Sequence, residues 1–526
     1  MKGDFSRNSF DAAKHFSRVL MQQGRVTLDA DHNEQSDIVL HMLRTLARDL
    51  FGQHGGPADG RGFGLYIVDA EGQHRLMIGG GHYYVDGILV EIDTECDYAH
   101  QPDYLLPSDT SGAVKDTMAQ WLQNPSSHQD FWVYLDVWER HVTWIEDDKI
   151  REVALGGPDT CTRTKVVWQV KAMTTEAVLA ILKRKGAAKA IPSSIEIQQL
   201  CTVLSDALDP ISNAQMAARL DPEVQINDPC AISPNTKYRG TENQLYRIEI
   251  HHDGTGREAT FKWSRDNGSV VAPWLDTDGD NLIVGSARSF EAPCWIEISD
   301  DSFDLNTKPG ILVKVISVAG DRLSIDPATK PTIWPIARNA NLHPKVRRWD
   351  QRDGDLTTLV DGAVTIRESA DTTPDWISLE DSIQIRFSLG GIYRTGDYWL
   401  LPARVATGDI EWSLKIGQDG KPEIDQYNHL IPESRPPCGI EHHYASLGII
   451  KGQDVSPSKS TILSCRNCCD SLGTKLCSPI YELAQTVRPQ IPDRAPSVIV
   501  KPKNTVASST PPAKAKPKPN PKSKPR

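Results

Sequence analysis

The sequence lacks the features of a membrane-spanning or exported protein. Among its 526 residues there is no apolar run of about 18 residues, the length that a transmembrane helix needs. The opening MKGDFSRNSF has no apolar stretch of the kind that a secretory signal contains. We therefore expect synthesis in the cytoplasm, where the ten cysteines would stay reduced rather than form a disulfide scaffold.

The common catalytic signatures are also missing. There is no Gly-x-Ser-x-Gly elbow, no phosphate-loop lysine and no His-Glu-x-x-His helix. The glycine-rich stretch 60–64 follows a predicted helix rather than a strand, so we interpret it as a loop and not as a dinucleotide site. We predict that the chain is not an enzyme. A polysaccharide-acting enzyme stays open as an alternative, because two carboxyls in a cleft suffice for glycoside hydrolysis. Candidate acids and sugar-stacking rings, which in strands are more often core residues, are Asp136, Glu139, Asp397, Trp138, Trp144 and Trp399.

Charge is unevenly distributed. The net charge is −11, but residues 501–526 carry eight Lys or Arg and no acid, so residues 1–500 carry −19. An acidic body argues against a nucleic-acid surface, and we predict no nucleic-acid partner. From about residue 488 the chain is a low-complexity Pro/Lys sequence that cannot bury enough apolar surface to fold. We expect a disordered tail there.

Strand patterns dominate the chain after one strong helix. Apolar residues fall on one face of a predicted helix over 34–51, which Gly52 ends. Residues 83–90 read as a hairpin turning at Asp86-Gly87. Further strands are expected at 131–137, 164–170, 246–250, 260–263, 269–272, 295–298, 311–318, 382–387 and 397–401, and helices at 174–184 and 194–207.

Strands about ten residues apart predict a mainly β protein with minor α content and sandwich- or barrel-like domains. The predicted divisions are a docking segment and helix (1–52), a first β domain (53–172), a helical insertion (173–230), a second β domain (231–415), a C-terminal segment with a Cys cluster (416–487) and a disordered tail (488–526).

Three polar motifs suit specific roles. The acidic stretch 276–281 resembles a calcium loop but lacks the Gly and Glu of an EF-hand, which favours an acidic turn. The segment 262–268 suits buried ion pairs beside a turn. A structural zinc ion is a possible cofactor, because the two thiolates of a Cys-x-x-Cys motif can coordinate one zinc ion. The alternative is a thiol-rich segment that can be oxidised. The proposed ligands are Cys465, Cys468, Cys469 and Cys477, with His442 and His443 as possible contributors.

The opening MKGDFSRNSFDAAKHFSRVLMQQGRVTLDADHNEQ resembles the N-terminus of a bacterial family found in gene clusters for phage-tail-like contractile injection systems. FWVYLDVWERHVTWIEDDKIREVALGGPDTCTRTKVVWQV, YRGTENQLYRIEIH, FKWSRDNGSVVA and YRTGDYWLLPAR extend the likeness to about residue 450. The order GRVTLDADHNEQ, helix, HYYVDGILVEI is also similar to the start of baseplate-attached fibre proteins. His32 stands where the family's pattern has an aromatic residue.

The resemblance implies a structural or adaptor protein of such a particle, near the baseplate, in a cage or at a fibre base. The polar opening segment is predicted to lie along a partner subunit, with the following helix as a clamp. Several copies are expected, because such particles are symmetric. A carbohydrate- or receptor-binding module that contacts surface glycan is a further alternative. The predicted partner-binding residues are Phe5, Phe10, Phe16, Val19, Leu20 and Arg25.

Overall fold

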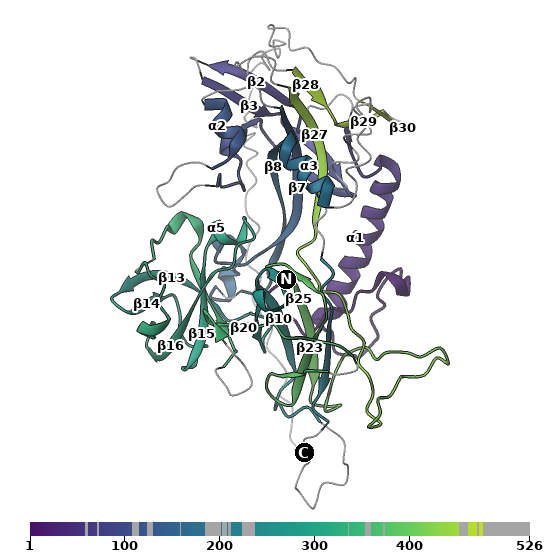
Figure 1. The fold of residues 1–526 in the computed structure, drawn as a ribbon, viewed down its shortest axis with the longest axis vertical. Coiled ribbons are helices and arrows are strands. Elements are labelled where there is room, and N and C mark those ends of the chain that lie inside the picture. Colours follow the sequence, from purple (N-terminus) through teal and green to yellow (C-terminus); the bar gives the residue numbers. More distant parts are fainter. Residues whose placement is uncertain are drawn as a thin grey trace, which may run out of the picture. The chain divides into compact units, whose positions relative to one another are not determined.

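The computed structural model describes residues 1–476 except 58–61, 71–72, 108–114, 124–129, 158, 185–200, 202–207, 209–211, 223–236, 335, 353–358, 372–373, 452–460 and 471–472. The described chain is mainly β, which confirms the predicted fold class (Figure 1). The expected tail (488–526) and nearly all of the expected helix 194–207 lie outside the described residues. Within the described part, no helix is both long and apolar enough to span a bilayer.

The longest helix, α1 (Asp29–Phe51), begins five residues earlier than predicted. Asp29 and Asp31 lie in its first turn, where carboxylates are stabilised by the positive end of the helix dipole. Gly52 ends it with φ of 74°, and its N–H donates to the Arg48 carbonyl. The other helices are short: α2 (Thr117–Gln123), α3 (Thr175–Arg184) and α5 (Asp301–Asp304), with 3-10 turns at Ala12–Lys14, Tyr98–His100, Asp148–Ile150, Val153–Leu155, Gly256–Glu258, Pro327–Thr329 and Ala340–Leu342.

Three sheets enclose the first hydrophobic core. The five-stranded sheet has the order β30 (Gly473–Leu476), β29 (Asn467–Asp470), β1 (His54–Pro57), β4 (Gly81–Val85), β5 (Ile88–Ile92). The three-stranded sheet is β2 (Leu65–Ala70), β3 (Gln73–Ile78), β6 (Cys96–Asp97). The four-stranded sheet is β28 (Thr461–Ser464), β27 (His442–Lys451), β7 (Asp130–Val142), β8 (Arg163–Thr174).

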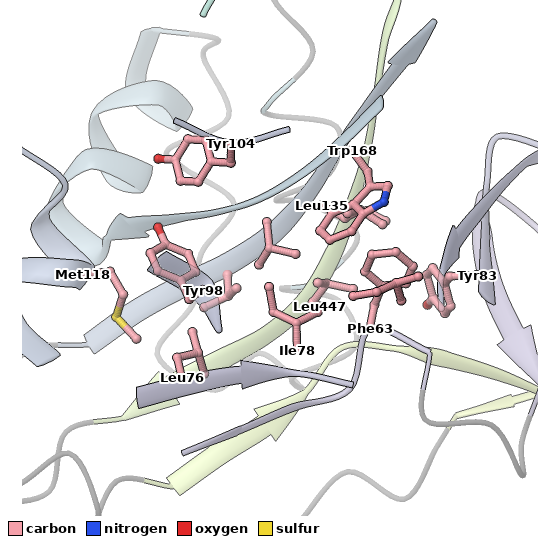
Figure 2. Packing of buried hydrophobic residues seen from close by; sticks show 14 of the residues in the cluster. Phe63, Leu76, Ile78, Tyr83, Tyr98, Tyr104, Met118, Leu135, Trp168 and Leu447 are labelled. Carbon is pink, nitrogen blue, oxygen red and sulfur yellow. The ribbon is translucent and has the colours of Figure 1, made fainter. Parts of the chain in front are cut away.

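Residues from both ends of the chain build this core. Leu135 on β7 and Leu447 on β27 lie in the same cluster, which Figure 2 shows together with Phe63 and Trp168. Strand β27 pairs with β7 over its whole length, from His442–Trp138 to Lys451–Asp130. The predicted C-terminal segment (416–487) therefore completes the sheet of the first predicted β domain.

A second group of sheets packs around a separate core. The six-stranded sheet runs β19 (Leu359–Val360), β20 (Ala363–Thr365), β12 (Thr260–Ser264), β10 (Gln244–His252), β25 (Tyr398–Arg404), β26 (Asp409–Ile410). The facing sheet is β21 (Glu368–Ser369), β23 (Ile383–Ser388), β22 (Ile377–Ser378), with β9 (Met216–Leu220) also paired to β23. A ribbon of β11 (Gly254–Thr255) and β24 (Ile392–Tyr393) completes the group. Strand β9 lies inside the predicted helical insertion.

A closed barrel interrupts the second group between β12 and β19. Its strands follow the order β13 (Val271–Asp278), β14 (Asn281–Val284), β17 (Arg322–Ile325), β16 (Ile311–Ala319), β15 (Cys294–Ser299), β18 (Lys345–Trp349). Closure leaves no free sheet edge, and the apolar interior forms its own core. The predicted second β domain is therefore a sheet pair that carries an inserted barrel.

The hairpin β4–β5 turns at Asp86-Gly87 as predicted, with φ of 48° and 82°. A Cβ at position 87 would also collide with the carbonyl oxygen of Arg44 in α1. We expect Gly87→Ala to lower the free energy of unfolding by at least about 2 kcal/mol, because it adds a clash with the α1 backbone to the strain of positive φ. Urea unfolding measures this.

The matched control is Gly279→Ala, because Gly279 has φ of 59° but a Cβ added there would have no heavy atom within 4 Å. Its free energy of unfolding should fall by about 1 kcal/mol, from backbone strain alone. Equal losses in the two variants would show that the contact between α1 and the hairpin is not tight.

Candidate docking surface

The first residues of the chain fold back on its own body instead of standing free for a partner. The Gly3 carbonyl accepts a hydrogen bond of 2.9 Å from Nδ2 of Asn267, in the turn between β12 and β13. The Phe5 ring meets His141 edge-on, with 6.0 Å between ring centroids. The Phe10 ring lies against His41 of α1, at 5.8 Å. Phe5 and Phe10, predicted as partner anchors, are thus half-buried against residues of the same chain, and their role as partner anchors stays a prediction.

A buried ion cluster fixes this opening stretch. Lys2 Nζ lies 2.9 Å from Glu249, which also pairs with Arg247 at 2.6 Å and Lys262 at 3.3 Å. Lys262 bonds Glu297 of the barrel at 2.5 Å. Burial alone would raise the pKa of Glu249, but the three cations outweigh it and hold that pKa well below its usual range. The segment 262–268 was expected to suit buried or interfacial ion pairs, and Lys262 and Asp266 both form such pairs, with Glu297 and Arg348.

Residues 16–28 behave differently, because their apolar side chains face solvent. Val26 is 84% exposed and Leu20 is 68% exposed. Val19 is half-buried, and its N–H donates to Oε1 of Gln35 at 2.9 Å. The loop encloses a hollow of about 200 Å³ lined by Val19, Leu20, Met21, Arg25, Val26 and Asp31, among others. Three predicted partner residues thus surround one concave site, while Phe16 is exposed nearby.

Helix α1 presents its apolar face away from the body. Ile38 is buried, and Arg44 makes a bidentate pair with Glu139 of β7 at 2.7 and 3.1 Å. At 100° per residue, the opposite side carries a stripe that is about half exposed: Val39, Met42, Leu43, Leu46 and Leu50. The predicted clamp stays a prediction: the N-terminal segment contacts polar residues of α1, such as Glu34, and leaves the stripe exposed.

The candidate catalytic acids are held in separate interactions. Asp136 bonds Lys171 at 2.7 Å and His442 at 2.6 Å. Burial would raise its pKa, but these partners lower it. Glu139 pairs with Arg44, and Asp397, just before β25, accepts from Ser212 at 3.1 Å. Burial raises the pKa of Asp397.

The aromatic residues were interpreted mainly as core residues and the acidic stretch 276–281 as a turn, and the structure agrees. Trp138 and Trp399 are buried, as core residues would be, while Trp144 lies under the guanidinium of Arg151. The stretch 276–281 forms the β13–β14 hairpin turn. Its Asp278 and Asp280 carboxylates pair with Arg322 and Lys330.

The cysteine prediction needs correction at Cys465. The structure joins Cys465 to Cys201 in a disulfide, and a disulfide sulfur is not a thiolate ligand. The expectation that all cysteines are reduced fails for this pair. Cys468 and Cys469 lie on β29, and Cys477 lies outside the described residues, so a zinc site on those three remains a prediction.

Sequence reasoning missed part of the surface. Met21, Val26 and Leu28 are as exposed as the predicted anchors, and they were overlooked because they show no helical or strand period. The signal that could have found them is the density of large apolar residues in a segment without secondary-structure pattern.

The fold and this surface together define a β-rich protein. Its N-terminal region exposes apolar side chains that no described part of the chain covers. The chain belongs to DUF6519, a family of unknown function, whose model matches residues 1–198 and 186–526. No curated protein matches it. A crystal structure of TssK aligns with 74% of this chain and 99% of that chain, at 8% identity and a TM-score of 0.17. A score this low does not indicate a common fold.

Proposed function

We propose that this chain is a non-catalytic structural or adaptor subunit of a phage-tail-like contractile injection particle, attached through its N-terminal region. The observation that carries the proposal is the uncovered apolar surface of residues 16–28 and α1. Eleven large apolar side chains are exposed there: Phe16, Leu20, Met21, Val26, Leu28, Val39, Leu40, Met42, Leu43, Leu46 and Leu50. At about half exposure they present on the order of 1,000 Å², more than the few hundred Å² that a monomer usually exposes in one patch.

The kind of particle comes from the sequence resemblance, which is strongest in this same region. The hollow of residues 19–31 is lined by apolar side chains such as Leu20 and Val26 and by the charged residues Arg25 and Asp31. Such a site suits an apolar side chain of a particle subunit, with the two charges fixing its orientation.

Two substitutions in the hollow test the attachment. We expect Leu20→Glu with Val26→Glu to lower the occupancy of the chain in purified particles at least about tenfold, because placing charges in an apolar contact costs several kcal/mol of binding. Quantitative mass spectrometry of particles from cells that express the full-length variant measures the occupancy. Both side chains are exposed, so the variant should fold normally.

The matched control is Leu155→Glu, because Leu155 is 69% exposed but lies outside the N-terminal region. It should leave occupancy unchanged. Full occupancy of the double variant, or an equal loss in the control, would refute attachment through this surface.

A further inference from the structure

We infer that the stripe on α1 binds the α1 helix of a second copy of this chain, in antiparallel orientation. This inference rests on the proposed function, because it assigns one part of the N-terminal region to self-association. The hollow of residues 19–31 then remains free for the particle.

The spacing of the stripe is the first argument. Val39, Leu43, Leu46 and Leu50 are separated by four, three and four residues, the a/d spacing of a helix–helix seam. The series reads the same in both directions. A two-fold axis beside residues 44 and 45 therefore places Val39 opposite Leu50 and Leu43 opposite Leu46 of the other copy. A self-complementary patch is what an isologous dimer requires.

Charge selects the antiparallel orientation. The first three turns of α1 carry four acids and no Lys or Arg: Asp29, Asp31, Glu34 and Asp37. A parallel pair would place these acidic halves side by side, whereas an antiparallel pair keeps them at opposite ends. The two helix dipoles also oppose each other in that arrangement.

The stripe itself carries no charge, which argues against an acidic or basic occupant. Its five side chains are Val39, Met42, Leu43, Leu46 and Leu50. At about half exposure they offer roughly 500 Å² per copy, so the pair hides roughly 1,000 Å², the lower limit for a specific interface. We therefore expect a dimer that dissociates in the micromolar range. Helix α1 contacts the body at β1, β4 and β30, and the stripe residues are exposed.

Sedimentation velocity on the full-length chain tests the pairing. The wild type should dimerise at micromolar concentration, and Leu43→Glu or Leu46→Lys alone should weaken the dimer at least about 100-fold, because each places two charges in the seam. The variant that carries both changes should recover most of the lost affinity, since the carboxylate introduced at position 43 would then face the ammonium introduced at position 46 of the other copy. A parallel pair would instead oppose like charges in that variant.

The control Leu155→Glu should dimerise like the wild type. A wild-type chain that stays monomeric, single variants that dimerise normally, or a double variant as weak as the single ones would overturn the inference. If the wild type is monomeric but its entry into particles still depends on Leu20 and Val26, this inference fails and the proposed function stands. Leu43 and Leu46 are 57% and 56% exposed, so loss of folding would not explain a weaker dimer.

Discussion

Glu249→Gln is expected to lower the free energy of unfolding by about 3–5 kcal/mol, among the largest effects of any single substitution in this chain. Glu249 is 3% exposed and is the shared partner of Lys2, Arg247 and Lys262. Its neutralisation removes the carboxylate that these three cations share and leaves Lys262 paired with Glu297. A buried charge without its partner costs far more than an ion pair contributes, because the ion has lost its hydration.

Urea unfolding measures the loss as a lower midpoint with an unchanged slope. The control is Asp278→Asn, which removes the partner of Arg322 in an ion pair whose side chains are more than half exposed. That change should alter stability by less than about 1 kcal/mol. A loss below about 1 kcal/mol in Glu249→Gln would show that water reaches the cluster and that Lys2 does not anchor the N-terminus.

The protein is expected to lose stability steadily as the pH falls from about 6.5 to 4. Burial lowers the pKa of His54 to about 4 and those of His141 and His251 to about 3. The unfolded chain binds protons at these residues near pH 6.5, whereas the folded chain does not until the pH is well below that. Acidification therefore favours the unfolded state, by on the order of 2 kcal/mol per histidine at pH 5.

Carboxylates affect the stability of the fold in a separate range, at lower pH. Lysine partners outweigh burial and hold the pKa of Glu146 and of Glu297 at about 2. The stability that these groups contribute is complete above their unfolded pKa of 4.5 and disappears as the pH falls toward 2. The loss between pH 6.5 and 5 therefore belongs to the histidines together with the N-terminal amine, whose pKa burial lowers from 8.0 to about 5.

His141→Phe isolates one histidine. Nε2 of His141 is buried and has no hydrogen-bond partner among the described residues, so a phenyl ring removes an unpaired nitrogen and can still pack on Phe5. We expect a smaller drop in unfolding free energy between pH 7 and 5 in this variant, measured by urea unfolding at each pH. A drop equal to that of the wild type would mean that His141 is protonated in the folded protein.

Local signals in the sequence were sufficient to predict many of the helices, strands and turns. The apolar run 131–137 and the Asp86-Gly87 turn predicted β7 and the β4–β5 hairpin, because a strand's apolar content and a turn's positive φ are local requirements. The apolar face of α1 was also readable. The sequence did not show which way this face points, because an amphipathic pattern does not distinguish a face that packs on the chain's own core from one that binds another chain.

Elements that depend on distant partners were missed. Strand β18 contains Lys345 and Arg347, whose charges argue against a buried strand until Glu146 and Asp304 are seen beside Lys345, each at 2.6 Å. The same limit applies to β27, which completes a sheet with β7 some 300 residues earlier. The opening segment looked unable to fold alone because its anchoring residues, such as Glu249, are equally distant.

The most direct test of the account asks whether the apolar N-terminal region is covered in the assembled state. Carbene footprinting of the full-length chain, free at high dilution and within purified particles, would measure the labelling of Leu20, Val26, Leu43 and Leu46, with Leu155 as the internal reference. We predict that labelling of the first four residues falls severalfold in particles while that of Leu155 is unchanged. Equal labelling of these residues in both states would contradict the account, because a docking surface cannot remain open to solvent in the assembly it forms.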